Sequence, residues 1–388
     1  MSFFSVSTYN FRNLENTQVN TNAKNIFLIG ENGHGKTNFL EAVYVLCFGN
    51  SFRTKIDSLF VREDENEMSV KGVYDYAAIE QGGSNKDVAS LRSEIKNNIL
   101  LSIVKGKKTI ILNEKKIKDR KEIIYNIPCV VFSHDDIYFV NGTPERRRNF
   151  FNQTISLFDC NYLDNLRQYE RVLKNRNAVL KNRDKEILSV LDMQLAEKGL
   201  ELIKTREKIT EEFNETFSVV FSKVSAFDSK IKIIYKPSWG FEPDIEKIKT
   251  ILLSKIEAET ALGTTLSGPH RDRFYYFMNK KDFTKIASTG QTRLISLALK
   301  TAQAEFYKEK TGKKPLVLLD DALLELDKQK KIRFIESFPE YEQAFFTFLP
   351  GEEQIISEKA GKDGIFYTVN NGVIKERSTR GCPIRTKV

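Results

Sequence analysis

Histidine and cysteine are scarce in this chain of 388 residues, and each scarcity excludes a class of site. With only three histidines, the sequence excludes a histidine-rich metal site. The four cysteines are Cys47, Cys129, Cys160 and Cys382, and they lie far apart without a C-x-x-C pair. This spacing fits neither a structural zinc site nor a disulfide framework, and it indicates a reducing compartment.

Long apolar runs are also absent. No stretch approaches the roughly 20 residues of a membrane-spanning helix, and residues 1–5 show neither a basic nor an apolar region typical of a signal peptide. Hydrophobic residues make up 40% of the chain and charged residues 29%, so a globular core is expected. We therefore expect a cytoplasmic protein without membrane contact, with two domains or one large discontinuous domain.

The charge balance favours an anionic partner. The formal net charge is +9 at pH 7, which suits nucleic acid, although basic proteins without such a partner are common. Arg146–Arg148 and the lysines of Lys105–Lys108 suit phosphate contacts, and solvated surface charge explains them equally well. Because no base-reading motif is present, any DNA recognition is expected to depend on charge and shape.

The strongest motif is the stretch Gly30–Thr37, which fits the phosphate-binding pattern G-x-x-x-x-G-K-S/T. It follows an apolar run at Asn25–Ile29, a predicted buried strand, and precedes a predicted helix at Asn38–Leu46. Glycines allow backbone amides to turn toward an anion, Lys36 can reach the β- and γ-phosphates, and Thr37 can ligate Mg²⁺. The predicted nucleotide-binding residues here are Gly30, Glu31, Asn32, Gly33, His34, Gly35, Lys36, Thr37 and Asn38.

An acidic pair supplies the second half of the expected chemistry. The apolar run Leu316–Leu319 predicts a buried strand, and Asp320 and Asp321 follow at its carboxyl end, where parallel α/β sheets bind ligands. We assign Asp320 to Mg²⁺, directly or through water, and assign Asp321, with Lys36, a catalytic role in which Asp321 polarises or positions water. The alternative is a surface turn with two acidic residues.

A second candidate for phosphate binding is Ser288-Thr289-Gly290-Gln291, which precedes a predicted helix at Thr292–Phe306. One nucleotide has no room for two such elements on one sheet, so Ser288, Gly290 and Gln291 are predicted to serve a nucleotide held by another subunit. Simple capping of the helix by Ser288 or Thr289 is the alternative.

The middle of the chain is predicted to be helical. Leucines and other apolar residues recur at steps of three and four from about 144 to 225, which indicates an antiparallel helix pair with a bend near 182–184. We therefore predict an N-terminal head segment at 1–113, an inserted helical arm lobe at 114–262 and a C-terminal head segment at 263–388.

The order of these motifs resembles the RecF family of SMC-like ABC-type ATPases. Beyond the phosphate-binding loop, the S-x-G-Q stretch and the acidic pair, four further segments match that family's patterns. They are Gly49–Thr54 (G-x-S-F-R-T), Val131–Ile137 (F-S-P-E-D-L), Gly142–Arg148 (G-x-P-x-x-R-R-R) and Gly268–Asp272 (G-P-H-R-D). The resemblance implies an α/β fold, with a discontinuous ABC-type ATPase head and the helical arm lobe inserted in it.

By the same resemblance, the chain is expected to bind ATP and Mg²⁺, to form an ATP-dependent homodimer and to act in recombinational repair and replication restart. It is expected to be a weak, DNA-stimulated ATPase at single-strand/duplex junctions, and to work with RecR and RecO in loading RecA. Ser288, Gly290 and Gln291 would touch the partner's ATP, and Asp327 would lie in a loop that crosses the dimer interface.

Some positions depart from the family's patterns. Leu324 replaces a serine, Arg273 an acidic residue and His134 a proline, and Thr347 stands where ABC transporters carry a histidine that senses the γ-phosphate. His270-Arg271-Asp272 either closes the arm onto the head or senses nucleotide. The competing functions are an SMC-like structural ATPase that clamps DNA and, from another class, a P-loop kinase of small molecules.

Overall fold

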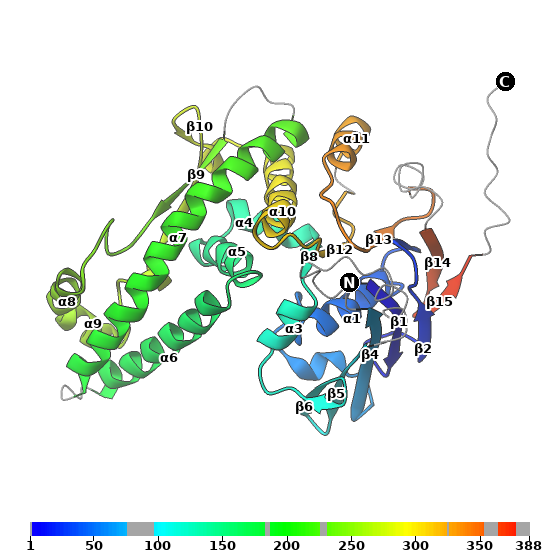
Figure 1. Ribbon diagram of the computed structural model, residues 1–388, viewed down its shortest axis with the longest axis horizontal. Coiled ribbons are helices and arrows are strands. Elements are labelled where there is room, and N and C mark those ends of the chain that lie inside the picture. The colour runs from blue at the N-terminus through cyan, green and yellow to red at the C-terminus, as the bar shows by residue number, and fades with distance from the viewer. Residues whose placement is uncertain are drawn as a thin grey trace, which may run out of the picture. The chain divides into compact units, whose positions relative to one another are not determined.

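The computed structural model describes residues 2–75, 97–182, 187–225, 231–323, 326–352 and 364–377 (Figure 1). Residues 183–184 of the predicted bend, Leu324 and Cys382 lie outside the described residues. The chain forms two compact units. The first comprises Met1–His134, Lys314–Glu325 and Glu340–Val388, and the second comprises Asp135–Lys313 and Leu326–Pro339.

The first unit contains two sheets of six strands each. The antiparallel sheet has the order β2-β1-β4-β5-β6-β7, and the core sheet has the order β15-β14-β3-β13-β12-β8. In the core sheet all neighbouring strands are parallel except β14 and β15. The strands of the antiparallel sheet are β1 (Ser2–Tyr9), β2 (Thr17–Asn20), β4 (Glu67–Asp75), β5 (Asn97–Val104), β6 (Lys107–Leu112) and β7 (Lys115–Lys116). Those of the core sheet are β3 (Asn25–Ile29), β8 (Cys129–Phe132), β12 (Leu316–Leu319), β13 (Ala344–Phe348), β14 (Gly364–Asn370) and β15 (Val373–Glu376).

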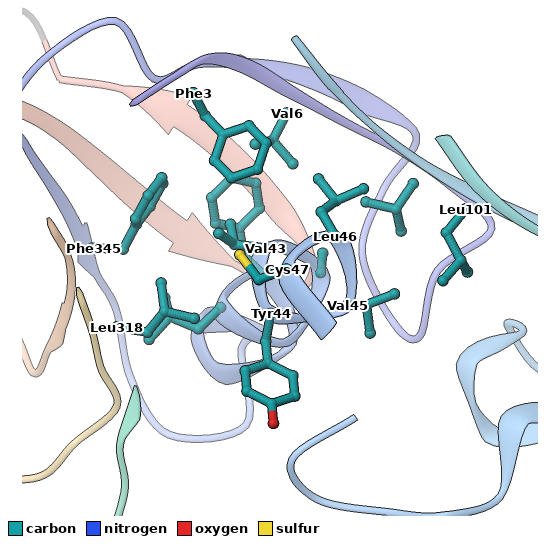
Figure 2. Close-up of a cluster of buried hydrophobic side chains, with 14 of the residues drawn as sticks. Phe3, Val6, Val43, Tyr44, Val45, Leu46, Cys47, Leu101, Leu318 and Phe345 are labelled. Atoms are coloured by element: carbon teal, nitrogen blue, oxygen red, sulfur yellow. The ribbon is translucent and has the colours of Figure 1, made fainter. Parts of the chain in front are cut away.

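Helix α1 (Lys36–Phe48) lies between the two sheets and is buried along nearly its whole length. Figure 2 shows its apolar side chains between those of the antiparallel sheet, such as Phe3 and Leu101, and those of the core sheet, such as Leu318 and Phe345. A helix that is apolar on all sides has to be covered on all sides, which the two sheets achieve. The short helix α3 (Lys121–Asn126) also packs against α1.

The second unit is mainly helical. Its helices are α4 (Tyr138–Asn141), α5 (Pro144–Ser156), α6 (Cys160–Asn182), α7 (Leu188–Ser225), α8 (Ile245–Ser254), α9 (Ile256–Leu262), α10 (Thr289–Thr311) and α11 (Lys328–Glu336). The long helices α6 and α7 pack along each other, as the apolar periodicity predicted, and α10 packs on α7 (Figure 1). An antiparallel sheet of three strands completes this unit with β9 (Ile231–Lys236), β10 (Arg273–Met278) and β11 (Lys281–Asp282).

Buried charged side chains connect separate elements within the second unit. Arg206 on α7 donates to Asp272 Oδ2 at 2.8 Å and to the Pro269 carbonyl at 2.8 Å, and both partners lie in the G-P-H-R-D stretch. The Tyr235 hydroxyl on β9 also donates to Asp272. These contacts give Asp272 a structural role within the second unit.

The compact units differ from the predicted boundaries. Residues 114–134 belong to the first unit because β8 pairs with β12 in the core sheet. Residues 263–313 belong to the second unit because β10 pairs with β9 and α10 packs on α7. The discontinuous architecture itself is confirmed, and within the described residues no helix is both long enough and apolar enough to cross a bilayer.

Candidate nucleotide-binding site

The phosphate-binding loop has the backbone that its glycines permit. Strand β3 ends at Ile29, and helix α1 begins at Lys36 with Gly35 as its N-cap. Gly33 and Gly35 adopt φ angles of 82° and 109°, which side chains with a Cβ rarely adopt. At Gly30, an added Cβ would lie 2.2 Å from the Val369 carbonyl oxygen of β14. The loop therefore turns tightly against the core sheet.

Lys36 lies inside this loop. Its side-chain ammonium donates to the carbonyl oxygens of Gly30 at 2.8 Å and Glu31 at 3.1 Å, and only 3% of the residue is exposed. These two carbonyl oxygens supply the hydrogen-bond acceptors that the buried ammonium group needs from within the protein. The ammonium group is thus held at the concave side of the loop, beside the N-terminus of α1.

Thr37 and Asp320 come together at the carboxyl edge of the core sheet. The Thr37 hydroxyl donates to Asp320 Oδ1 at 2.9 Å. Strand β12, which precedes Asp320, is separated from β3 in the sheet by β13 alone. Burial, and secondarily the charge of Asp321, raises the pKa of the Asp320 carboxyl from 3.8 to about 6. A cation bound nearby would therefore stabilise the ionised form of the Asp320 carboxyl.

Asp321 adopts an unusual backbone conformation beside Asp320. Its φ angle is 47°, in the left-handed region that aspartate adopts more readily than most residues with a Cβ. Its amide donates to Thr347 Oγ1 on β13 at 2.8 Å, and its Oδ1 lies 3.0 Å from the same hydroxyl. Thr347 therefore contacts both the backbone and the side chain of Asp321.

Segments outside the motif support the loop. The amide of Asn371, in the turn between β14 and β15, donates to His34 Nδ1 at 3.1 Å, and the next amide, that of Gly372, donates to the His34 carbonyl at 2.9 Å. Asn13 donates from its side chain to the Gly33 carbonyl at 3.3 Å. Asn38, predicted to bind nucleotide, donates to Asn13 Oδ1 at 2.6 Å and so helps to fix that residue.

A buried carboxylate beneath the start of α1 was missed by the sequence reasoning. Glu41 is fully buried and accepts two hydrogen bonds from Arg12, at 2.9 and 2.7 Å, and one from Ser51. Arg53 lies 3.4 Å from Glu41 and also donates to Asn38 Oδ1 at 2.7 Å. Ser51 and Arg53 belong to the G-x-S-F-R-T stretch, which was the available signal. That stretch is thus anchored on α1.

Ser288, Gly290 and Gln291 lie in the second unit, at the start of α10. Ser288 and Gln291 form a reciprocal capping box, in which the Ser288 amide donates to Gln291 Oε1 at 2.9 Å and the Gln291 amide to Ser288 Oγ at 3.3 Å. Apart from its chain neighbours and the backbone of α10, none of the described residues has an atom within 4 Å of a Cβ built on Gly290. The capping box accounts for the side chains of Ser288 and Gln291 without a partner subunit. The open surface at Gly290 leaves room for another molecule to approach closely.

Several basic residues that the sequence offered for DNA have partners within their own unit. Arg147 donates to the Phe274 carbonyl at 3.0 Å and Arg148 to the Asp272 carbonyl at 2.9 Å. Lys108 pairs with Asp57 at 2.7 Å. These contacts favour a structural role for Arg147, Arg148 and Lys108 over contacts with DNA phosphates.

The donor set at Thr37 and Asp320 fits Mg²⁺ only in part. Among the described residues, no group of three or more His, Cys, Asp or Glu side chains could hold a metal ion. One hydroxyl and one carboxylate match the way Mg²⁺ is bound beside nucleotides, where phosphates and water supply the other ligands. The site thus suits a metal that arrives with a nucleotide.

Comparisons with known proteins find relatives along most of the chain. The model of the RecF/RecN/SMC N-terminal domain matches residues 4–372. The chain is 39% identical over 349 residues to the DNA replication and repair protein RecF of Treponema pallidum, covering 89% of this chain and 94% of that protein. It is 32% identical over 348 residues to RecF of Leptospira interrogans, covering 87% of this chain and 89% of that protein.

Among solved structures, the recombination mediator protein RecF with ATP, of the RecFOR pathway, superposes with a TM-score of 0.84 at 28% identity, covering 97% of this chain and 98% of that one. An SMC head bound to the C-terminal winged-helix domain of ScpA superposes with a TM-score of 0.56 at 15% identity, covering 98% of each chain. The second match bears on the fold alone.

Proposed function

This chain belongs to the RecF/RecN/SMC N-terminal domain family, and from that membership we propose that it binds and hydrolyses ATP in DNA replication and repair. The single observation that carries the proposal is the hydrogen bond between Thr37 and Asp320 at 2.9 Å. It unites the end of the phosphate-binding loop with the first residue of the acidic pair. A loop that only turned the chain would not require a buried carboxylate at this position.

The residues of the site divide the work. Backbone amides from Gly30 to Thr37 face the phosphates, and Lys36 exchanges the Gly30 and Glu31 carbonyls for the β- and γ-phosphates. Thr37 and Asp320 would hold Mg²⁺, which would supply charge neutralisation beside the phosphates. Asp321 orients and polarises the attacking water.

We further propose that ATP joins two copies of the chain head to tail. Gly290 is exposed and leaves space for a close approach, and α10 presents its N-terminal amides beside it. Ser288, Gly290 and Gln291 would then contact the partner's ATP, and Asp327 would lie in the interface. Hydrolysis would release the dimer because the γ-phosphate contacts are lost.

DNA at single-strand/duplex junctions is the proposed macromolecular partner, with RecR and RecO as proposed protein partners in RecA loading. The solved RecF–ATP structure belongs to a protein of the RecFOR pathway, which supports this assignment. A net charge of +9 supports binding through phosphates. We propose slow hydrolysis that DNA stimulates.

An SMC-like ATPase that clamps DNA structurally is the second candidate, because the matching family model covers SMC proteins as well as RecF. The arm argues against it, because α7, the longest helix of the described residues, has 38 residues and reaches about 57 Å at 1.5 Å per residue. A P-loop kinase of small molecules is disfavoured by the family membership.

The test is an ATPase assay with and without junction DNA over a range of salt concentrations. The proposal expects weak hydrolysis that junction DNA stimulates, with DNA binding that weakens steeply as salt rises and depends little on sequence. A kinase would instead transfer phosphate to a small molecule and ignore DNA. Hydrolysis that junction DNA leaves unchanged would contradict the proposal.

A further inference from the structure

A single buried hydroxyl, that of Thr347, is shared by both members of the acidic pair. Thr347 lies on β13, which pairs in parallel with β12 so that Leu319 lies opposite Phe346. Asp320 follows Leu319, and Thr347 follows Phe346. The threonine therefore lies beside the acidic pair. Its exposed fraction is 1%. This hydroxyl is therefore held in a fixed, water-excluded position.

The contacts of this hydroxyl define its role. Thr347 Oγ1 accepts a hydrogen bond from the Asp321 amide at 2.8 Å. It lies 3.0 Å from Asp321 Oδ1 and 3.3 Å from Asp320 Oδ1, so its one proton has two carboxylate acceptors within reach. The same Asp320 oxygen accepts from Thr37. A line of hydrogen bonds thus runs from the phosphate-binding loop through Asp320 and Thr347 to Asp321.

The conformation of Asp321 shows why such a tether is needed. At φ 47° its backbone is in the left-handed region, which costs energy for a residue with a Cβ. Two carboxylates on consecutive residues also repel each other when both are ionised. An acceptor for the amide and a donor for the carboxylate, supplied by one hydroxyl, offset both costs and fix the direction of the side chain.

We propose that Thr347 is a positioning residue for ATP hydrolysis, whose hydroxyl holds Asp321 in the orientation that directs water. The proposal rests on the proposed ATPase function. It assigns Thr347 a contact with the acidic pair instead of direct sensing of the γ-phosphate. Because the hydrogen bonds of the Thr347 hydroxyl involve Leu319, Asp320 and Asp321, we expect the residue to affect turnover and to leave ATP binding nearly unchanged.

The test compares Thr347→Val, which keeps the shape and removes the hydroxyl, with Thr347→Ser, which keeps the hydroxyl. Thr109→Val on β6 makes the same chemical change away from the site and serves as control. We expect kcat to fall at least tenfold in Thr347→Val, with KM and ATP affinity within about threefold of the parent, and Thr347→Ser to recover most of the rate. Unchanged kcat in Thr347→Val, or equal loss in both variants, would overturn the proposal.

A crystal structure of Thr347→Val gives a readout that does not depend on activity. The proposal expects Asp321 to leave the left-handed region or to turn its carboxylate away from Asp320. An Asp321 that keeps φ near 47° and the same side-chain direction would overturn it. If the parent protein failed to hydrolyse ATP, the proposed function would fall, and this structure would still decide whether the hydroxyl positions Asp321.

Discussion

The hydroxyl of Thr37 donates to Oδ1 of Asp320 across 283 positions of sequence, at a distance of 2.9 Å. Neither residue is informative alone, because threonines begin many helices and acidic residues end many strands. Their contact joins the residue that follows the phosphate-binding lysine to a buried carboxylate at the same edge of one sheet.

Replacing Lys36 with alanine is expected to weaken ATP binding about 100-fold, or about 2.8 kcal/mol. The reason is that the ammonium group is the charged donor which the loop directs at the phosphates. Equilibrium titration with ATP measures the effect, and Lys71→Ala, which removes the same charge from an exposed position on β4, is the control. Equal affinities for the parent and Lys36→Ala would remove the loop from nucleotide binding.

Replacing Asp321 with asparagine is expected to leave ATP affinity within about threefold and to slow hydrolysis at least 100-fold. Asparagine tolerates the left-handed backbone as well as aspartate does, so the substitution removes the charge and spares the turn. Asp64→Asn is the matched control, since Asp64 also has a positive φ, 65°, and is exposed. Normal turnover in Asp321→Asn would exclude Asp321 from catalysis.

The pH dependence of metal-assisted ATP binding should follow Asp320. Its pKa is raised to about 6, so the carboxylate is ionised above pH 7 and becomes protonated as the pH falls through 6. Because only the ionised form binds Mg²⁺, the gain in ATP affinity from Mg²⁺ should fall about tenfold between pH 7 and pH 5.

In the absence of metal, the pH dependence of folding stability has the opposite sign to that of Mg²⁺-assisted ATP binding. A raised acid pKa means that the native state binds the proton more tightly than the unfolded state. The stability gained by protonating Asp320 is therefore fully present below about pH 3.8, falls as the pH rises from there, and is lost above about pH 6. ATP titrations with and without Mg²⁺ at each pH check the sign for binding, and urea unfolding without metal over the same pH range checks the sign for folding, with Asp320→Asn as control in both. A Mg²⁺ effect constant from pH 5 to pH 8 would contradict the assignment.

Replacing Arg206 with leucine is expected to destabilise the second unit by about 3–5 kcal/mol, because Asp272 would remain buried without its cation. Lys249→Leu, which removes a half-exposed lysine from its pair with Glu246 on α8, should cost less than about 1 kcal/mol. Urea unfolding followed by the fluorescence of the buried Trp239 compares the two variants. Equal losses would show that Arg206 has no special structural role.

The phosphate-binding loop and its neighbours were predictable because local chemistry determines them. The strand at Asn25–Ile29 and the helix after Gly35 follow from apolar runs and glycines, and Asp320 and Asp321 follow directly from the strand they end. The positions of Ser288 and Gln291 at a helix start were also local, and the capping box supplies their partners within the chain.

Long-range pairing accounts for what the sequence did not yield. The buried Glu41 accepts hydrogen bonds from Arg12 and Ser51, which lie on separate loops. Thr347 contacts Asp321 because two strands pair in a register that no local sequence pattern encodes. The unit boundaries also depended on pairing, since β8 pairs with β12 in the core sheet. Such contacts depend on the folded topology, which periodicity alone does not specify.

The central claim is that ATP joins two copies of this chain through the N-terminus of α10. Analytical sedimentation of the parent protein and of Ser288→Arg, without nucleotide and with ADP or ATP, tests it directly. The account predicts that the parent dimerises with ATP alone. Ser288→Arg should bind ATP as a monomer with near-normal affinity and fail to dimerise, because arginine fills the close approach beside Gly290. A Ser288→Arg protein that dimerises with ATP like the parent would reduce Ser288 to a helix cap, and a parent that stays monomeric with ATP would contradict the account.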